Sequence, residues 1–580
     1  MASHISKLLF AVSSAFFIQA GAYASADLIL LNGKVFTANA DEPQVSALAV
    51  KDGRILAVGG NAQIETLGGE RTRRIDLAGK RVMPGLVDAH AHVVFGGLQL
   101  ISTSLEDEEL PVAELESYAA ELLDQGEALQ GDIVFIQGMH SSYWSQIAEL
   151  NRVFNGGRWA QRPIVLLGSD FHTAWINQPM RRRAGIDAHY VESLASDQKH
   201  TIGAGADGVP NGLVIDAGWD RVSRAMPKLP GEVLETAAAQ AVKHLNSLGI
   251  TAWMDPAANA APGEGLFAIA AESDKVGVLP AYKALAERGE LTAHVAALLV
   301  APPKGTPQDL DALAAVQKQF SGVANLSFPG IKIFADGVLE YPAQSAAMLH
   351  AYHGKKDAGH LLIDPRTFGD LVSAADERGW IVHIHAIGDR AVRESLNGIA
   401  KARSDRQSRV PHSITHIHVA NPADFKRFKE LNVAAVMQLL WATADHYTVD
   451  LIQPYINPDA YRYQYPARSL MQAGAEIAGA SDWPISPPNP WEAIHQAISR
   501  TGPLGVLNEA ERMPREQLFY AYTRNAARAA GLEAVTGTLE IGKSADFVIL
   551  DRDVFSIDAD EIADTRVLST FFAGSEVYAP

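Results

Sequence analysis

The stretch from Pro84 to Gly97 reads PGLVDAHAHVVFGG, an apolar run that carries an aspartate and two histidines. His90 and His92 are separated by a single alanine. In a β-strand, side chains two positions apart point to the same face, so we expect the two imidazoles to project together. The pattern predicts a buried strand whose end contributes to a chemical site.

Further apolar runs follow downstream and alternate with helical patterns such as EVLETAAAQAVKHLNSLG and DRAVRESLNGIAKAR. Alternating strands and helices predict βαβ units and a parallel sheet, and eight such units predict an α/β fold of the (β/α)8 TIM barrel type. An open doubly wound sheet is the alternative. The runs are Val82–Val94, Gly249–Asp255, Leu291–Leu299, Phe328–Asp336, Trp380–Ala386, His412–Val419, Val433–Gln438 and Ala475–Asp482.

Polar side chains recur at or near the carboxyl ends of these runs, where the active sites of barrels lie, and this favours the barrel. Neutral imidazole and carboxylate groups are ligands that hold zinc or a similar divalent ion. His383 and His418 lie two residues from two of the candidates, which leaves the register open, and we interpret His383 as a core or supporting residue. The candidates are His90, His92, Lys332, His385, His416 and Asp482.

Both ends of the chain, residues 25–83 and 533–580, contain short β-type runs. The dipeptides Asn32-Gly33 and Asp52-Gly53 between such runs predict hairpins. Within the barrel region, residues 84–532, the gap at about 97–230 is too long for one helix and contains the strand-like segments GDIVFIQG and RPIVLLGSD. Long connections usually have structure of their own, so we expect an inserted α/β subdomain over the barrel mouth.

The first residues, MASHISKLLFAVSSAFFIQAGAYASAD, have an early lysine, an apolar run from Leu8 to Ile18 and an A-x-A pattern that ends at Ala24. This is typical of a secretory signal peptide over residues 1–24, and we expect an exported protein, periplasmic or secreted, with no membrane association after cleavage. An uncleaved anchor is the alternative, but the run is shorter than the ~20 residues that span a bilayer. The chain has no cysteine, so no disulfide stabilises it.

The chain of 580 residues carries 49 Lys and Arg against 67 Asp and Glu, a net charge of −18. This sign is wrong for neutralising phosphates, so nucleic acid and anionic membranes are excluded as expected partners, and we expect a small-molecule substrate. A length of 580 residues with 47% hydrophobic residues predicts a folded protein of more than one domain. The composition is compatible with a homo-oligomer and does not decide the oligomeric state.

Several motifs in the same order resemble the amidohydrolase superfamily, and most closely its YtcJ-like branch, amidohydrolase family 3. The resemblance covers nearly the whole chain after the leader. It implies that one or two metal ions, with zinc as the expected metal, are bound by the six candidates named above, and that the flanking β segments form one composite β-sandwich. The matching motifs are VMPGLVDAHAH, IKIFADG, VHIHAIGDRAV, ITHIHV, AGASDWPISPPNPWEAI, YTRNAARAAG and GTLEIGKSADFVILDRD.

Lys332 and Asp482 each have a structural alternative. Lys332 could form an ion pair with Asp336 or a neighbouring carboxylate, but the resemblance favours a carbamate, N6-carboxylysine, that bridges two metals. Asp482 could cap the following helix. As a catalytic residue it would accept a proton from a metal-activated water as hydroxide attacks a carbonyl, and then protonate the leaving nitrogen, while His416 helps to stabilise the oxyanion.

Substrate contacts are expected from the insertion. GSDFHTAWIN resembles the H-x-x-W-x-N segment of the family, which implies that His172, with Trp175 and Asn177 nearby, lines the pocket. Tyr143 and Trp144 in GMHSSYWS are further candidates. The alternative for these aromatic side chains is packing inside the insertion.

We therefore predict a metal-dependent amidohydrolase that acts on a non-peptide C–N bond, in an N-acyl or N-formyl amide. The same site could serve an esterase, lactonase or phosphotriesterase. An isomerase or deaminase is a further alternative. A non-catalytic periplasmic binding protein with a structural zinc is the alternative outside enzymes, but structural zinc sites are closed four-ligand shells, unlike a set of candidates around an open mouth.

Overall fold

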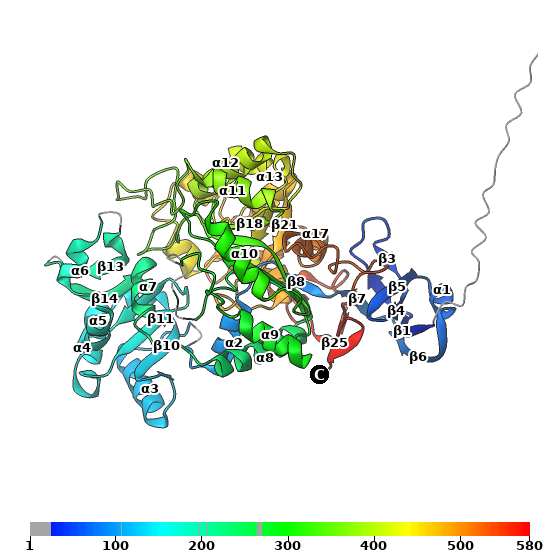
Figure 1. Ribbon diagram of the computed structural model, residues 1–580, viewed down its shortest axis with the longest axis horizontal. Helices are drawn as coiled ribbons and strands as arrows, with labels where there is room; N and C mark the ends of the chain where they lie inside the picture. The colour runs from blue at the N-terminus through cyan, green and yellow to red at the C-terminus, as the bar shows by residue number, and fades with distance from the viewer. Residues whose placement is uncertain (1–24, 106, 196–197, 206, 263, 265–268) are drawn as a thin grey trace, which may run out of the picture.

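The computed structural model describes residues 25–105, 107–195, 198–205, 207–262, 264 and 269–580. The predicted signal peptide, residues 1–24, lies outside the described residues. A central barrel is flanked by an inserted subdomain on one side and by a β-sandwich on the other (Figure 1). Among the described residues, no helix has both the length and the apolar character that a membrane span requires.

The barrel is built from parallel strands that follow one another in chain order, and each of the predicted runs contributes one strand. Its ends meet where Ala89 N donates to Gly479 O at 3.1 Å and Ser481 N donates to Asp88 Oδ1 at 3.1 Å. The predicted (β/α)8 class is confirmed, and the open sheet is excluded. The strands are β8 (Leu86–Asp88), β15 (Ile250–Asp255), β16 (His294–Val300), β17 (Leu326–Phe334), β18 (Ile381–Ala386), β19 (Ser413–His416), β20 (Ala434–Met437) and β21 (Glu476–Gly479).

Side chains alternate along these strands between the helix layer and the barrel interior. On β15, the Trp253 ring lies 6.3 Å from that of Tyr282 on a surrounding helix. Ala252 and Met254 therefore face inward, where they belong to a separate core cluster with Leu298. The helices around the barrel are α2 (Val93–Ile101), α8 (Gly231–Ser247), α9 (Leu279–Arg288), α10 (Asp309–Gln319), α11 (Phe368–Glu377), α12 (Asp389–Asp405), α13 (Phe425–Glu430), α14 (Pro458–Tyr461), α15 (Ala467–Gln472), α16 (Pro490–Ser499), α17 (Arg515–Ala521) and α18 (Arg524–Ala529).

Helix α2 directly follows His92 and packs closely on α8. A Cβ at Gly97 would lie 2.1 Å from Ala237 O and 3.0 Å from the Ala241 methyl group. Only glycine permits this close approach of the two helices.

The predicted insertion lies between α2 and α8 and has its own mixed sheet, with strand order β13-β14-β12-β11-β10-β9. The two expected segments form neighbouring parallel strands, β10 and β11. The strands are β9 (Leu129–Gln130), β10 (Ile133–Met139), β11 (Ile164–Gly168), β12 (Thr173–Ile176), β13 (Ile202–Ala204) and β14 (Pro210–Ile215). The helices are α3 (Val112–Gln125), α4 (Ile147–Phe154), α5 (Gln178–Ala184), α6 (Ala188–Ser193) and α7 (Ala217–Ser223).

The two chain ends meet in the sandwich, where β24 pairs antiparallel with β7. Asp553 strengthens this junction by accepting from Arg81 at 2.7 Å and from Lys34 at 2.9 Å. One sheet has the order β5-β4-β1-β6 and the other β26-β25-β24-β7-β2-β3. The elements are β1 (Ala26–Leu31), β2 (Lys34–Phe36), β3 (Gln44–Val45), β4 (Ala47–Lys51), β5 (Arg54–Gly59), α1 (Asn61–Glu65), β6 (Gly68–Asp76), β7 (Arg81–Pro84), β24 (Phe547–Leu550), β25 (Val567–Phe572) and β26 (Ser575–Tyr578).

One of the two predicted hairpins is wrong. Asp52 and Gly53 have φ values of 49° and 73° and join β4 to β5 as a hairpin. At Asn32-Gly33 only Asn32 has a positive φ, 58°, and the turn leads from β1 in one sheet to β2 in the other. A two-residue type I′ hairpin needs positive φ at both central residues, so the Asn-Gly signal alone did not decide the pairing.

Candidate active site

His90, His92 and Asp482 converge at the carboxyl end of the barrel. His90 Nε2 lies 3.1 Å and His92 Nε2 3.3 Å from Asp482 Oδ1. The expectation that both histidines belong to a strand is wrong, because β8 ends at Asp88 and His92 immediately precedes α2. The side chains nevertheless meet, because the loop turns both rings towards Asp482.

The chemistry of these atoms fits a divalent cation. His90 Nε2 and Asp482 Oδ1 are buried and have no hydrogen-bond partner. Burial holds the pKa of His90 well below its usual value, so the ring is neutral. With the proton of the neutral His90 ring on Nδ1, Nε2 presents a lone pair to a carboxylate oxygen, and a cation between the two atoms would satisfy both. Two imidazoles and a carboxylate are a zinc ligand set, although other first-row divalent ions use the same ligands.

His383 supports His90 from one layer deeper in the barrel. His383 Nε2 lies 2.7 Å from His90 Nδ1, and His383 Nδ1 lies 2.6 Å from Ser413 Oγ. We assign the proton between the rings to His90 Nδ1, which leaves His90 Nε2 as the lone-pair ligand. The outer ring nitrogen of His383 then donates to Ser413.

His385 and His416 reach the same mouth in different ways. On β18, Val382 and Ile384 pack in the outer core, so alternation turns His385 inward. On β19, Ile414 packs outward, and the same rule would turn His416 outward as well. His416 instead has a φ of 75°, a conformation that is uncommon outside glycine, and its ring centroid lies 4.5 Å from that of His385.

Hydrogen bonds orient both of these rings. His385 Nε2 lies 3.2 Å from Gly337 O, so this nitrogen donates and Nδ1 carries the lone pair. His416 Nδ1 lies 3.1 Å from Gln438 Oε1, and Gln438 also donates to Thr415 Oγ1 at 3.4 Å. Gln438 was not among the predicted site residues. The available signal was its position as a polar residue at the end of the seventh apolar run.

Lys332 lies inside the barrel on β17, beside His383 in register, and it lines the same cavity as the histidines. Burial lowers the pKa of its amine to about 7. The alternative of an ion pair with Asp336 is not realised, because the Asp336 carboxylate accepts from the backbone amides of Ala347, Ile387 and Gly388. An amine with a pKa of about 7 has a substantial neutral fraction at pH 7, and the neutral amine is the form that reacts to give a carbamate.

Asp482 is held in place by its backbone. Its φ is 60°, and its amide donates to His90 O at 2.8 Å. Burial raises the pKa of Asp482, but His92 and His416 outweigh burial and hold the pKa below its usual value. Its second oxygen, Oδ2, lies 3.7 Å from His416 Nδ1. The N-cap alternative is excluded, because Asn489 caps the next helix, α16.

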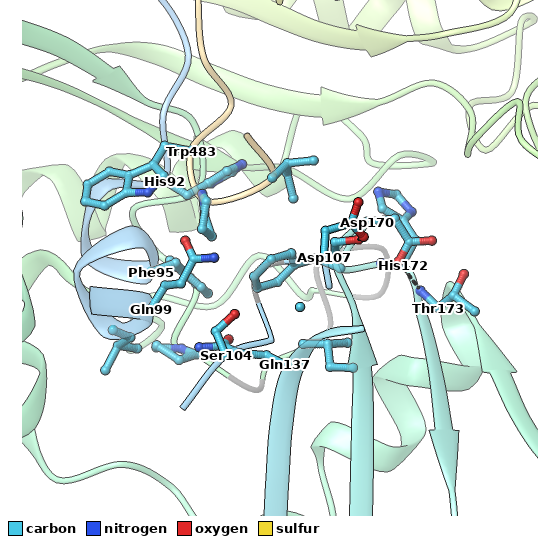
Figure 2. Close-up of a pocket in the computed structure, with 18 of the residues that line it drawn as sticks. His92, Phe95, Gln99, Ser104, Asp107, Gln137, Asp170, His172, Thr173 and Trp483 are labelled. Carbon is cyan, nitrogen blue, oxygen red and sulfur yellow. Dashed lines mark hydrogen bonds between the residues drawn. The ribbon is translucent and has the colours of Figure 1, made fainter. Parts of the chain in front are cut away.

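The site opens into a cavity of about 1800 Å³ between the barrel mouth and the insertion. His92, Phe95 and Trp483 line one part of it and Asp170 and His172 another (Figure 2). This volume exceeds the roughly 300–1,000 Å³ of most small-molecule sites. The cavity therefore has room for much more than the atoms that react at the metal site.

Buried polar contacts fasten the insertion over the barrel. His172 Nδ1 lies 2.8 Å from Asp216 Oδ1, and Ser345, in the loop after β17, donates to Asp216 Oδ2 at 2.9 Å. Tyr447, in the short helical turn His446–Asp450, donates to Asp107 at 2.8 Å. These contacts place His172 beside the metal site, with its ring centroid 6.3 Å from that of His385.

Comparisons with known proteins identify the family of this chain. The model of the amidohydrolase family matches residues 73–578. The chain belongs to the amidohydrolase family. It is 28% identical to Protein LONG AFTER FAR-RED 3 of Arabidopsis thaliana over 95% of this chain and 92% of that protein. It is 23% identical to the N-substituted formamide deformylase of Arthrobacter pascens over 94% of this chain and 97% of that protein. An uncharacterized metal-dependent hydrolase from Pyrococcus horikoshii OT3 has the same fold, with a TM-score of 0.68, 23% identity and coverage of 92% of this chain and 99% of that chain.

The substrate residues expected in this amidohydrolase divide into two groups. His172 and Trp144 line the cavity. Tyr143 and Trp175 are fully buried in the core of the insertion and are not among the lining residues. The Tyr143 hydroxyl bonds to the backbone of Leu110, so these two aromatic side chains follow the packing alternative.

The amidohydrolase site also contains lining residues that the sequence analysis did not predict. Glu340 and His418 face each other, with His418 Nδ1 3.6 Å from Glu340 Oε1. Burial raises the pKa of Glu340 to about 7 and lowers that of His418 to about 3. The Trp441 ring stacks on His416 with centroids 5.8 Å apart. His418 was noted only as a register alternative, and no local pattern distinguished Glu340 or Trp441.

Proposed function

We propose that this amidohydrolase hydrolyses a non-peptide C–N bond, in an N-acyl or N-formyl amide. The observation that carries the proposal is the pair of unpartnered atoms, His90 Nε2 and Asp482 Oδ1, which face each other at 3.1 Å beside a large cavity. Homology to an N-substituted formamide deformylase supports the same bond class.

His90 and His92 would hold a divalent ion together with Asp482, and zinc is the metal that we propose. When bound, such an ion supplies Lewis acidity, which lowers the pKa of water to about 7 and polarises a carbonyl oxygen. His385, His416 and Lys332 lie at the same mouth and would complete the set, with Lys332 as a carbamate if a second ion binds. The low pKa of the Lys332 amine, about 7, supports that modification.

Asp482 is suited to move the proton. Oδ1 faces the two histidines, whereas Oδ2 is directed towards His416 at 3.7 Å. Asp482 accepts a proton from the attacking water and delivers it to the leaving nitrogen. His416 donates its Nδ1–H to Gln438, so its other ring nitrogen carries a lone pair and would join the ligands of a bound ion rather than donate to the former carbonyl oxygen. His172 would contact the substrate from the insertion.

The test is a panel of N-formyl, N-acetyl and N-acyl amines and amino acids, with esters, lactones and phosphotriesters in parallel, assayed with added zinc or manganese. Asp482→Asn should lower kcat by about 10²–10⁴-fold, the usual contribution of a general acid–base group. It should retain most of the metal, because both histidines and one amide oxygen remain. Turnover of esters alone, or full activity after metal removal, would contradict the proposal.

A matched control is Asp376→Asn, which changes another buried carboxylate. Asp376 accepts from Arg403 and His412 in the helix layer and does not line the cavity. This variant should lose stability and keep the kcat of the folded enzyme. We also propose export of the enzyme, because residues 1–24 have a leader-like sequence, and N-terminal sequencing of the mature protein tests cleavage after Ala24.

A further inference from the structure

The side of the cavity along α2 differs chemically from the side near His172. Helix α2 starts directly after His92, and the half-buried side chains of His92, Phe95 and Gln99 lie on one face at helical spacing (Figure 2). The ring centroid of Phe95 is 6.0 Å from that of His92. With a rise of 1.5 Å per residue, this wall extends about 14 Å from His92 to the end of α2.

Large apolar side chains at the carboxyl end of α2 and on β9 also line the cavity and remain accessible. Leu100 is 48% exposed, Ile101 42% and Leu129 41%, and all three line the cavity. Single exposed apolar residues are ordinary, but a group of them that faces one cavity marks a binding surface. Across the same space, Tyr118 and Leu122 of α3 face the cavity at i, i+4 spacing.

The side formed by the barrel loops and the strand ends of the insertion is polar and acidic. Asp170, Glu340 and Asp445 line it together with His172. A leaving amine, which is polar and becomes cationic after release, suits this acidic side. A hydrocarbon chain, which needs no hydrogen-bond partner, suits the apolar part of the wall along α2, formed by Phe95, Leu100 and Ile101.

We propose that the compartment between α2 and α3 binds the unbranched hydrocarbon chain of a long-chain N-acyl amide, with the acyl carbonyl at His90, His92 and Asp482. This inference rests on the proposed amide hydrolysis and specifies its substrate class. The compartment is continuous with the metal site through Phe95, and its length of about 14 Å along α2 fits an extended chain better than a formyl or acetyl group.

The experiment compares kcat/KM for one amine acylated with acetyl, butanoyl, hexanoyl, octanoyl and dodecanoyl groups. Burial of each further methylene should raise kcat/KM about fourfold, or roughly 200-fold from butanoyl to octanoyl. The double variant Leu100→Gln/Ile101→Gln should lower the ratio of dodecanoyl to acetyl activity at least about tenfold, with the acetyl activity unchanged. Leu129→Gln, at a separate element, should lower the same ratio and provides a second variant if the first does not fold.

The matched control is Leu504→Gln/Val506→Gln. These residues are similarly exposed, at 53% and 45%, but lie on the hairpin formed by β22 (Thr501–Gly502) and β23 (Gly505–Val506) and do not line the cavity. The control should leave the chain-length ratio unchanged. A wild-type kcat/KM that is independent of chain length, or a preference for peptides with apolar side chains, would overturn the inference.

A binding measurement separates this inference from the proposed function. Calorimetry with hexanoate and dodecanoate on the zinc-loaded protein should show tighter binding of dodecanoate, and Leu100→Gln/Ile101→Gln should remove the difference. Dodecanoate binding without turnover of any amide would retain the chain site and refute amide hydrolysis. Equal affinity for the two carboxylates, or a difference that survives the double variant, would refute the chain site even if short amides are hydrolysed.

Discussion

Replacement of His383 by leucine tests whether the core of the barrel supports the metal site. His383 accepts from His90 Nδ1 at 2.7 Å and bonds to Ser413 Oγ at 2.6 Å, with no exposure to solvent. His383→Leu is similar in size but leaves the Nδ1 proton of His90 unpaired in the interior. Such a loss costs about 1–3 kcal/mol. If it is expressed fully in metal binding, affinity falls about 5–150-fold.

A second line of reasoning gives a similar magnitude. Outer-shell partners of metal-bound histidines typically contribute 10–100-fold in metal affinity or activity. The measurement is the zinc affinity of the folded protein by competition with a chromophoric chelator. Ser413→Ala, one bond further from the metal, should have a smaller effect than His383→Leu.

The matched control is His412→Leu. His412 is equally buried, but it bonds to Val382 N and Asp376, away from the metal ligands. This variant should lower the free energy of unfolding and leave zinc affinity unchanged. The reasoning is refuted if His383→Leu binds zinc as tightly as the wild type, or if His412→Leu weakens zinc binding to the same extent.

Three further changes test the helix packing, the buried lysine and the sandwich. Gly97→Ala should lower the free energy of unfolding by about 1–3 kcal/mol despite the better helix propensity of alanine, because its Cβ would lie 2.1 Å from Ala237 O; an unchanged Tm would contradict this. Burial lowers the pKa of Lys332 from its usual 10.5 to about 7, so between about pH 7 and pH 10 the unfolded chain binds more protons than the folded protein. The free energy of unfolding of the metal-free protein should therefore rise with pH by up to about 1.4 kcal/mol per unit in this range. Denaturant titrations of Lys332→Met should lack this slope. Burial raises the pKa of Asp553, but ion pairs with Lys34 and Arg81 outweigh burial and hold the pKa at about 2. Asp553→Asn should therefore lower the free energy of unfolding by about 1–2 kcal/mol above pH 5, and melting curves should show this loss disappearing between about pH 4 and pH 2. A loss that persists at pH 2 would indicate a packing defect instead.

Alternation along the strands made part of the site predictable. Lys332 and His385 lie in runs whose neighbouring residues are apolar and pack against helices, so a period of two turns both polar side chains inward. The close α2–α8 contact at Gly97 was not predictable, because a glycine in the sequence does not indicate which segment packs against it. Tyr143 and Trp175 show the limit of aromatic signals, since burial in the insertion core and exposure to a pocket leave the same local pattern.

The sequence by itself determined the barrel, the insertion and the set of candidate ligands, because strand and helix periodicity and the residues at strand ends are local properties. The tertiary structure decided how the ligands meet. His416 and Asp482 face the mouth through backbone φ values of 75° and 60°, which strand alternation does not predict. Gln438, Glu340 and the wall along α2 join the site only because distant segments pack there, and no local pattern encodes a contact between segments that are far apart in the chain.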